Sequence, residues 1–195
     1  DFRYQFYCED EAALEQQLDA LREEHAVDIT AGRAEVYALG NWAAVAYEGY
    51  EPGMYFRASA DGESAELYGY YYEDAPAEGI SVVVPDTWNG LPVAVVTNAF
   101  QSAEAVVSIK LPDTIRSIVS YAFRYSGIVD ITIPAGVTYI EGGAFENSYS
   151  LESITVEEGN AVYHSSGNCV IETETNTLII GCKGSVIPDD GSVTS

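Results

Sequence analysis

Side chains that commonly carry out catalysis or bind metals are few in this sequence of 195 residues. There are two histidines, His25 and His164, and three cysteines, Cys8, Cys169 and Cys182. Neither histidine belongs to a His-Glu-x-x-His or Cys-x-x-Cys motif, which would bring metal ligands together. The cysteines lack a protease signature, and there is no Gly-x-Ser-x-Gly elbow or phosphate-binding glycine loop. We therefore expect no catalytic residues, no metal site and no cofactor, and so no enzyme.

Carboxylates are the one abundant reactive group. The chain has 31 Asp and Glu residues against 8 Lys and Arg, for a formal net charge of -23. So acidic a chain forms carboxylate pairs by chance, which means that no glycosidase dyad can be singled out. The acidic runs 9–11 and 189–190 lack the spacing of a calcium loop. The charge argues against binding to nucleic acid or anionic membranes. It favours solubility, with basic partners or loosely held calcium as alternatives.

Two of the cysteines fall in a predicted β-hairpin. If residues 168–171 pair with residues 177–181, then Cys169 and Cys182 lie almost opposite each other. A disulfide between them would suit an exported protein, but cross-strand geometry is restrictive. Two buried thiols are the alternative. Cys8 has no evident partner.

The elements that position these side chains are indicated by an internal repeat between residues 93 and 156. Phe100, Phe123 and Phe145, each preceded by alanine, recur after 23 and 22 residues by subtraction of their numbers. An apolar triplet follows each pair: Val106, Ile109 and Leu111; Ile128, Ile131 and Ile133; Leu151, Ile154 and Val156. Repeats of this length predict a solenoid, because one unit cannot bury its apolar side without its neighbours.

Each closing triplet alternates as a half-buried strand does. We predict one short strand per coil there, stacked in parallel at a spacing of about 4.8 Å. Pro112 and Pro134 end two of these strands. The Ala-Phe pairs are expected to form short helical turns on the opposite side, with the phenyl rings inside. The alternative is an ordinary antiparallel sheet in which similar hairpins share a spacing by coincidence.

The pattern Ile-x-x-x-Ala-Phe, Leu-x-x-Ile-x-Ile-Pro, Val-x-x-Ile closely resembles the BspA-like bacterial leucine-rich repeats of secreted and cell-surface proteins. The resemblance covers about residues 54–195 and implies a leucine-rich repeat solenoid in an α/β repeat class. It further implies an extracellular or cell-surface location and adhesion or host-protein binding. It points to no activity, since solenoid scaffolds serve unrelated partners. Residues 191–195 match the start of another coil, so we expect the solenoid to continue beyond Ser195 and its last coil to expose an apolar face.

Residues 1–53 have a different pattern, that of a small β-α-β-β unit. Phe2, Tyr4 and Phe6 alternate with polar residues as in a strand, and Asp10 is placed to cap a helix from about Glu11 to His25. Residues 33–39 and 42–47 read as two strands joined at Gly40-Asn41. The unit is either an independent domain or an N-terminal cap that seals the first coil.

Between the two parts lies a tyrosine-rich run, with Tyr68 followed by Tyr70, Tyr71 and Tyr72. Alternation in a strand would turn some of these rings outward, where they could stack on sugars or protein side chains. The alternative is a strand packed against the N-terminal unit.

The strands of the repeat also predict a polar surface. If the triplet residues point inward, alternation turns six side chains outward on adjacent strands. They are Ser108, Lys110, Asp130, Thr132, Ser153 and Thr155, and we call them the ladder. A flat array of small polar groups suits a partner that lies along the sheet, such as an extended polypeptide or a glycan. Solvated strand residues with no ligand are the alternative.

Together these observations predict a non-enzymatic extracellular interaction or adhesion module with a protein or glycan ligand. No stretch approaches the roughly eighteen apolar residues that define a membrane span, so no membrane insertion is expected within this segment. Two alternatives remain. The repeats could be the scaffold of a larger enzyme whose catalytic part is absent or lies in residues 1–53, or they could be a rigid spacer.

Overall fold

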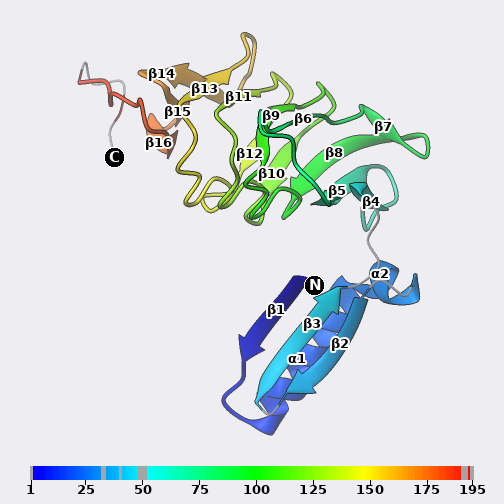
Figure 1. Cartoon of the computed structure of the whole chain (residues 1–195). Coiled ribbons are helices and arrows are strands. Elements are labelled where there is room, and N and C mark those ends of the chain that lie inside the picture. The colour runs from blue at the N-terminus through cyan, green and yellow to red at the C-terminus, as the bar shows by residue number, and fades with distance from the viewer. Residues whose placement is uncertain (1, 32–33, 40, 48–51, 190–192, 194–195) are drawn as a thin grey trace. The chain divides into compact units, whose positions relative to one another are not determined.

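A computed structural model describes residues 2–31, 34–39, 41–47, 52–189 and 193 of the chain. The chain forms two compact units, Asp1–Pro52 and Gly53–Ser195, coloured blue to cyan and cyan to red in Figure 1. The expected strand start Arg33, the turn residue Gly40 and all of residues 191–195 except Val193 lie outside the described residues.

The first unit is a three-stranded antiparallel sheet with helices. Its elements are β1 (Phe2–Tyr7), α1 (Glu11–Glu24), α2 (Ala26–Thr30), β2 (Ala34–Leu39) and β3 (Trp42–Tyr47), with strand order β1-β3-β2. Asp10 caps α1, since its carboxylate accepts a hydrogen bond of 2.8 Å from the N–H of Ala13. Leu18 and Leu21 of α1 are buried with Cys8 and Ala43. The predicted small α+β unit is confirmed.

The regular elements of the second unit, over its described residues, are all short strands joined by turns. They are β4 (Gly53–Ala58), β5 (Ala65–Tyr71), β6 (Ile80–Val83), β7 (Thr87–Trp88), β8 (Leu91–Thr97), β9 (Val106–Lys110), β10 (Ser117–Val119), β11 (Asp130–Ile133), β12 (Tyr139–Ile140), β13 (Ser153–Val156), β14 (Tyr163–Ser166), β15 (Cys169–Glu172) and β16 (Thr177–Gly181). The chain winds through them in successive coils (Figure 1).

Two sheets, built mainly from parallel strands, run along the coils. The first has the order β12-β10-β8-β5-β4, in which β4 is antiparallel, and β7 forms a small hairpin with β8. The second has the order β13-β11-β9-β6 and is wholly parallel. The predicted leucine-rich repeat solenoid, with a parallel strand at each closing triplet, is confirmed. The structure adds a second strand to each coil, β8, β10 and β12, of which the latter two are too short to show an alternating pattern in sequence.

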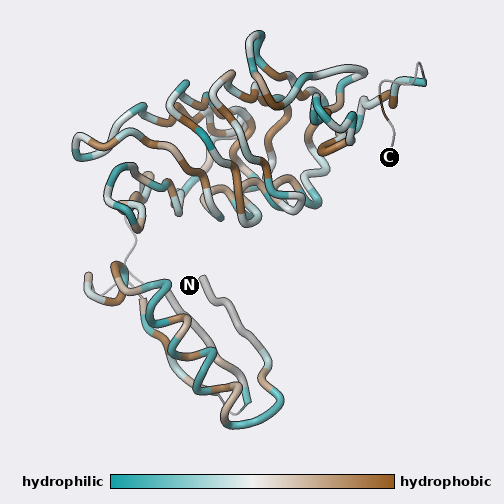
Figure 2. The backbone as a smooth tube through the Cα atoms, turned by 180° about the vertical axis from the view of Figure 1, so that it is seen from behind, coloured by the Kyte–Doolittle hydropathy of each residue, from teal (hydrophilic) through white to brown (hydrophobic). Residues whose placement is uncertain are grey.

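The phenylalanines of the repeat stack through the interior. Ring centroids lie 5.6 Å apart for Phe100 and Phe123 and 4.9 Å apart for Phe123 and Phe145. The backbone continues from coil to coil beside them, because the N–H of Phe123 donates to the carbonyl of Ala144 at 2.8 Å. Figure 2 shows hydrophobic and hydrophilic residues alternating along these coils. The phenyl rings are therefore interior, in turns held by i to i+3 hydrogen bonds such as Ala103 N–H to Phe100 O.

The tyrosine-rich run extends this aromatic stack. The ring of Tyr70 lies 5.5 Å from that of Phe100 and 6.1 Å from that of Tyr72. Burial, and then the neighbouring Tyr72, raise the pKa of Tyr70. Tyr72 accepts a hydrogen bond at its hydroxyl from the N–H of Ala105. Two of the four tyrosines thus pack on the solenoid core, which neither of the sequence-based alternatives anticipated, while Tyr71 is exposed.

The antiparallel hairpins β14-β15-β16 follow the last parallel strands, and side chains from them bond to several backbone groups on the outer edges of those strands. The N–H of Ile140 in β12 donates to the hydroxyl of Tyr163 at 3.1 Å. The N–H of Ile154 in β13 donates to Asn168 Oδ1 at 2.9 Å, and Asn168 Nδ2 donates to the carbonyl of Glu152 at 2.7 Å. Unpaired strand edges invite association, so these side chains take the place of a further strand.

The cysteine hairpin forms as predicted but without a disulfide. In the β15-β16 register Cys169 stands opposite Gly181, not opposite Cys182. A shift of one residue turns a side chain to the other face of a strand, so the two sulfurs do not meet. None of the three cysteines takes part in a disulfide within the described residues, and Cys182 is half-buried rather than fully buried.

Candidate functional site

The candidate site is the outward face of the second sheet, where the ladder residues fall into register. Asp130 on β11 is paired with Ser108 on β9 and with Ser153 on β13. Thr132 is paired with Thr155, and their hydroxyl oxygens lie 3.2 Å apart, within hydrogen-bonding distance. Parallel strands in register place equivalent side chains about 4.8 Å apart. The ladder is therefore a set of aligned rows rather than scattered polar residues.

Burial alternates along these strands. Ile109, Ile131 and Ile154 are buried in the core between the outward positions. Of the six ladder side chains, Ser108 is half-buried and the other five are exposed. The exposed ones are Lys110, Asp130, Thr132, Ser153 and Thr155. The period of two in a strand explains this alternation.

The face extends one strand further than the sequence predicted. On β6, Ser81 is paired with Ser108 and Val83 with Lys110, and Val83 is 66% exposed. The signal was present, because residues 80–85 end in proline as the later strands do. The strand β6 was missed because no Ala-Phe pair precedes it, whereas such a pair precedes each of the later strands of this sheet.

The chemistry available on this face is hydrogen bonding with little net charge. It offers hydroxyl groups, one ammonium group at Lys110 and one carboxylate at Asp130. At its β13 border, Lys183 Nζ forms an ion pair of 3.0 Å with Glu152 Oε1. Nothing among the ladder residues forms a nucleophile and base pair. Within the part of the chain that the structure describes, no three His, Cys, Asp or Glu side chains gather as metal ligands.

Both histidines make contacts within their own helix or hairpin. His25 is the C-cap of α1, where its N–H contacts the last helical carbonyls and a positive charge would be favoured. His164 on β14 has its Nδ1 3.1 Å from the hydroxyl of Thr173. Over the described ranges, no helix has the length and apolarity that crossing a membrane requires.

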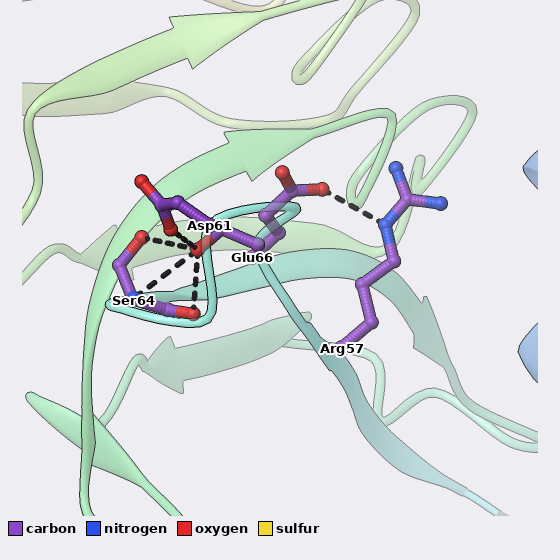
Figure 3. Close-up of polar contacts among 5 residues, drawn as sticks. Arg57, Asp61, Ser64 and Glu66 are labelled. Carbon is purple, nitrogen blue, oxygen red and sulfur yellow. Dashed lines mark hydrogen bonds and ion pairs between the residues drawn. The ribbon is translucent and has the colours of Figure 1, made fainter.

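A second ordered polar cluster lies at the β4-β5 hairpin (Figure 3). Arg57 Nε donates to Glu66 Oε2 at 2.8 Å across the two strands. In the turn, the hydroxyl of Ser59 and then the N–H of Glu63 donate to Asp61, and both bonds lower the pKa of that carboxyl. These bonds lie within the hairpin or its turn, so stabilising the hairpin is a sufficient explanation for the cluster.

Comparison with known protein families gives one match. The family described as BspA type leucine rich repeat region matches residues 93–190, in six copies. None of the curated proteins matches this chain.

Several solved structures are similar to this chain. A leucine rich cell surface protein from Faecalibacterium prausnitzii is 29% identical with a TM-score of 0.44, over 51% of this chain and 25% of that one. A leucine-rich repeat protein from Eubacterium ventriosum is 21% identical with a TM-score of 0.41, over 54% and 33%. The leucine rich repeat protein of T. pallidum is 21% identical with a TM-score of 0.33, over 52% and 68%. The match thus spans a quarter to a third of the length of the first two.

Proposed function

Because this chain belongs to the BspA type leucine rich repeat family, we propose that it is a non-enzymatic interaction module of a bacterial surface or secreted protein. The ladder face is its binding surface, and the partner is an extracellular protein that lies along the second sheet in an extended conformation. The observation that supports this most is the register of exposed hydroxyls, in which Thr132 and Thr155 are paired and 3.2 Å apart.

An extended chain fits this face for geometric reasons. The four strands β6, β9, β11 and β13 present small polar side chains in rows, with Val83 as a single exposed apolar group. Such a surface can hydrogen-bond repeatedly to a polypeptide backbone or its side chains, whereas a small molecule generally needs a concave apolar pocket. The net charge of -23 favours a partner with basic residues and speeds its approach.

The test is binding of the whole chain to an array of extracellular matrix proteins and glycans, in parallel with Thr132→Arg combined with Thr155→Arg. The two large cations would block the rows sterically. Thr138→Arg combined with Thr173→Arg is the matched control, because it adds the same charges at exposed threonines outside the second sheet.

Loss of a hit in the ladder variant alone would support the proposal. A hit that survives in the ladder variant would remove the ladder from the binding site. Silence of the unmodified chain across the array would favour the rigid spacer or the scaffold of a larger enzyme.

A further inference from the structure

A different surface, on the turns between the two sheets, carries exposed tyrosines. Tyr121 and Tyr125 lie between β10 and β11 and are 43% and 41% exposed, and Tyr149 lies between β12 and β13 and is 77% exposed. In these two turns, residues 120–129 and 141–152, the exposed large hydrophobic side chains are the three tyrosines and Val129, which is 39% exposed. We call them the tyrosine patch. It shares no residue with the ladder.

Two of these tyrosines stand where the backbone does not favour them. Tyr121 has φ of 57° and Tyr125 has φ of 55°, in the left-handed region that disfavours bulky side chains. In the preceding coil Asn98 and Ser102 hold the equivalent positions, with φ of 51° and 58°. In the following coil Asn147 holds the place of Tyr125, with φ of 58°. Asparagine tolerates this conformation, so the turn itself does not require tyrosine and the rings carry out another task.

The patch is held in place by its neighbours. The guanidinium carbon of Arg124 lies 4.7 Å from the ring centroid of Tyr121 and 4.9 Å from that of Tyr125. Arg124 Nε also forms an ion pair of 3.0 Å with Glu146 Oε2, although its N–H is not aligned for a hydrogen bond. The hydroxyl of Tyr149 donates to Asn147 Oδ1 at 2.7 Å. A surface ordered in advance loses little conformational entropy when it binds a ligand.

The chemistry of the patch combines flat apolar faces with hydrogen-bonding groups at their edges. The rings supply the faces, while Arg124, Glu146 and Asn147 supply donors and acceptors beside them. A pyranose ring has the complementary form, with a face of C–H groups surrounded by hydroxyls. Protein interfaces, in contrast, usually bury a continuous apolar core, whereas a single exposed aliphatic side chain, Val129, accompanies these rings within the two turns.

We infer that the tyrosine patch is a binding site for a neutral glycan. Sugar rings stack on the exposed tyrosine faces, and their hydroxyls hydrogen-bond to Glu146 and Asn147. An anionic glycan fits less well, because the chain carries a net charge of -23 and the one cation of the patch, Arg124, is already paired with Glu146.

The test uses the whole chain on an array of neutral oligosaccharides that contain glucose, galactose, mannose or N-acetylglucosamine, beside sialylated and sulfated ones. Tyr121→Asn combined with Tyr125→Asn removes the rings but keeps a residue that suits the backbone, as Asn98 and Asn147 do. Tyr121→Phe combined with Tyr125→Phe keeps the rings without the hydroxyls. Tyr139→Thr is the matched control, because Tyr139 is 53% exposed on strand β12.

We expect neutral oligosaccharides to bind the unmodified chain. The double Asn variant should bind them with an affinity lower by at least about tenfold. The double Phe variant and Tyr139→Thr should stay within about threefold of the original affinity. The melting temperature of the double Asn variant should be equal or higher, which a purely structural role for the rings would not produce. The inference is overturned if no neutral oligosaccharide binds at millimolar concentration, if only anionic ones bind, or if the double Asn variant binds equally well.

Discussion

The repeated coils and the hairpins that follow them hold the chain together in different ways. In the coils, Phe100, Phe123 and Phe145 stack on one another, and the stability is distributed over many apolar contacts. At the outer edges of β12 and β13, single polar side chains, chiefly Tyr163 and Asn168, accept hydrogen bonds from backbone N–H groups. Apolar packing is nondirectional and scales with the area buried. A side-chain hydrogen bond depends on one geometry, so its loss leaves specific groups unpaired.

The largest effect should come from the stack. Phe123→Ala removes a fully buried ring between two others and opens a cavity, which we expect to lower the free energy of unfolding by about 3 to 5 kcal/mol. Urea denaturation measures this. Phe123→Leu, which keeps most of the volume, should cost about 1.5 kcal/mol or less. A loss below about 1 kcal/mol for the alanine variant would show that the ring does not support the coil.

A smaller effect should follow at the hairpin. Asn168→Ala removes the partners of Ile154 N–H and Glu152 C=O, and we expect a loss of about 2 to 3 kcal/mol. Asn176→Ala is the matched control, because both asparagines have positive φ, 62° and 54°, so it isolates the backbone cost. Equal losses in the two variants would mean that strain, and not edge pairing, explains Asn168.

Tyr163 tests the same idea at the other sheet. Tyr163→Phe leaves the N–H of Ile140 without its acceptor while the ring remains buried, so about 1 to 2 kcal/mol should be lost. Tyr139→Phe, at an exposed ring, should change stability by less than about 0.5 kcal/mol. An unchanged melting temperature for Tyr163→Phe would indicate that another group satisfies β12.

Alkaline pH should weaken both regions through their tyrosines. Burial raises the pKa of Tyr70 and of Tyr163, an effect that the bond from Ile140 partly offsets at Tyr163. A raised folded-state pKa means that the stabilising contribution is complete below the unfolded value of about 10 and is lost as the pH rises through the folded pKa. Melting temperature against pH should fall above about pH 10, and less steeply when both tyrosines are replaced by Phe. A parallel decline would assign the effect to other groups.

The smallest effect is expected on the ladder. Thr132→Arg combined with Thr155→Arg changes exposed side chains, so stability should stay within about 0.5 kcal/mol. The same urea experiment checks it. A loss as large as that of Phe123→Ala would mean that these threonines lie in the core and that the assigned inward and outward faces of the strands are exchanged.

Much of the coil could be predicted because its pattern repeats. The period of Phe100, Phe123 and Phe145 and the alternation around Ile109, Ile131 and Ile154 predicted interior rings and outward polar side chains, as the structure has them. The second strand of each coil was not predicted; β10 and β12, with three and two residues, are too short to show a readable alternation. For the ladder, the sequence predicted which side chains face outward, while binding by them stays a proposal.

Features without a repeat were harder to predict. The hairpin of Cys169 was expected in the right place, but a register shift of one residue separates it from Cys182. The tyrosine patch gave no signal either, because Tyr121 and Tyr125 differ from their equivalents in other coils only by residue type. Their significance depends on backbone angles and on Arg124.

The solenoid, its period and the inward face of each closing strand follow from the order of residues, because stacked units must present apolar side chains at equal spacing. Tertiary structure alone decided that Tyr70 extends the phenylalanine stack, that Tyr163 and Asn168 close the parallel sheets, and that the cysteines remain apart. These contacts join residues from different elements, where a shift of one position in register changes every partner.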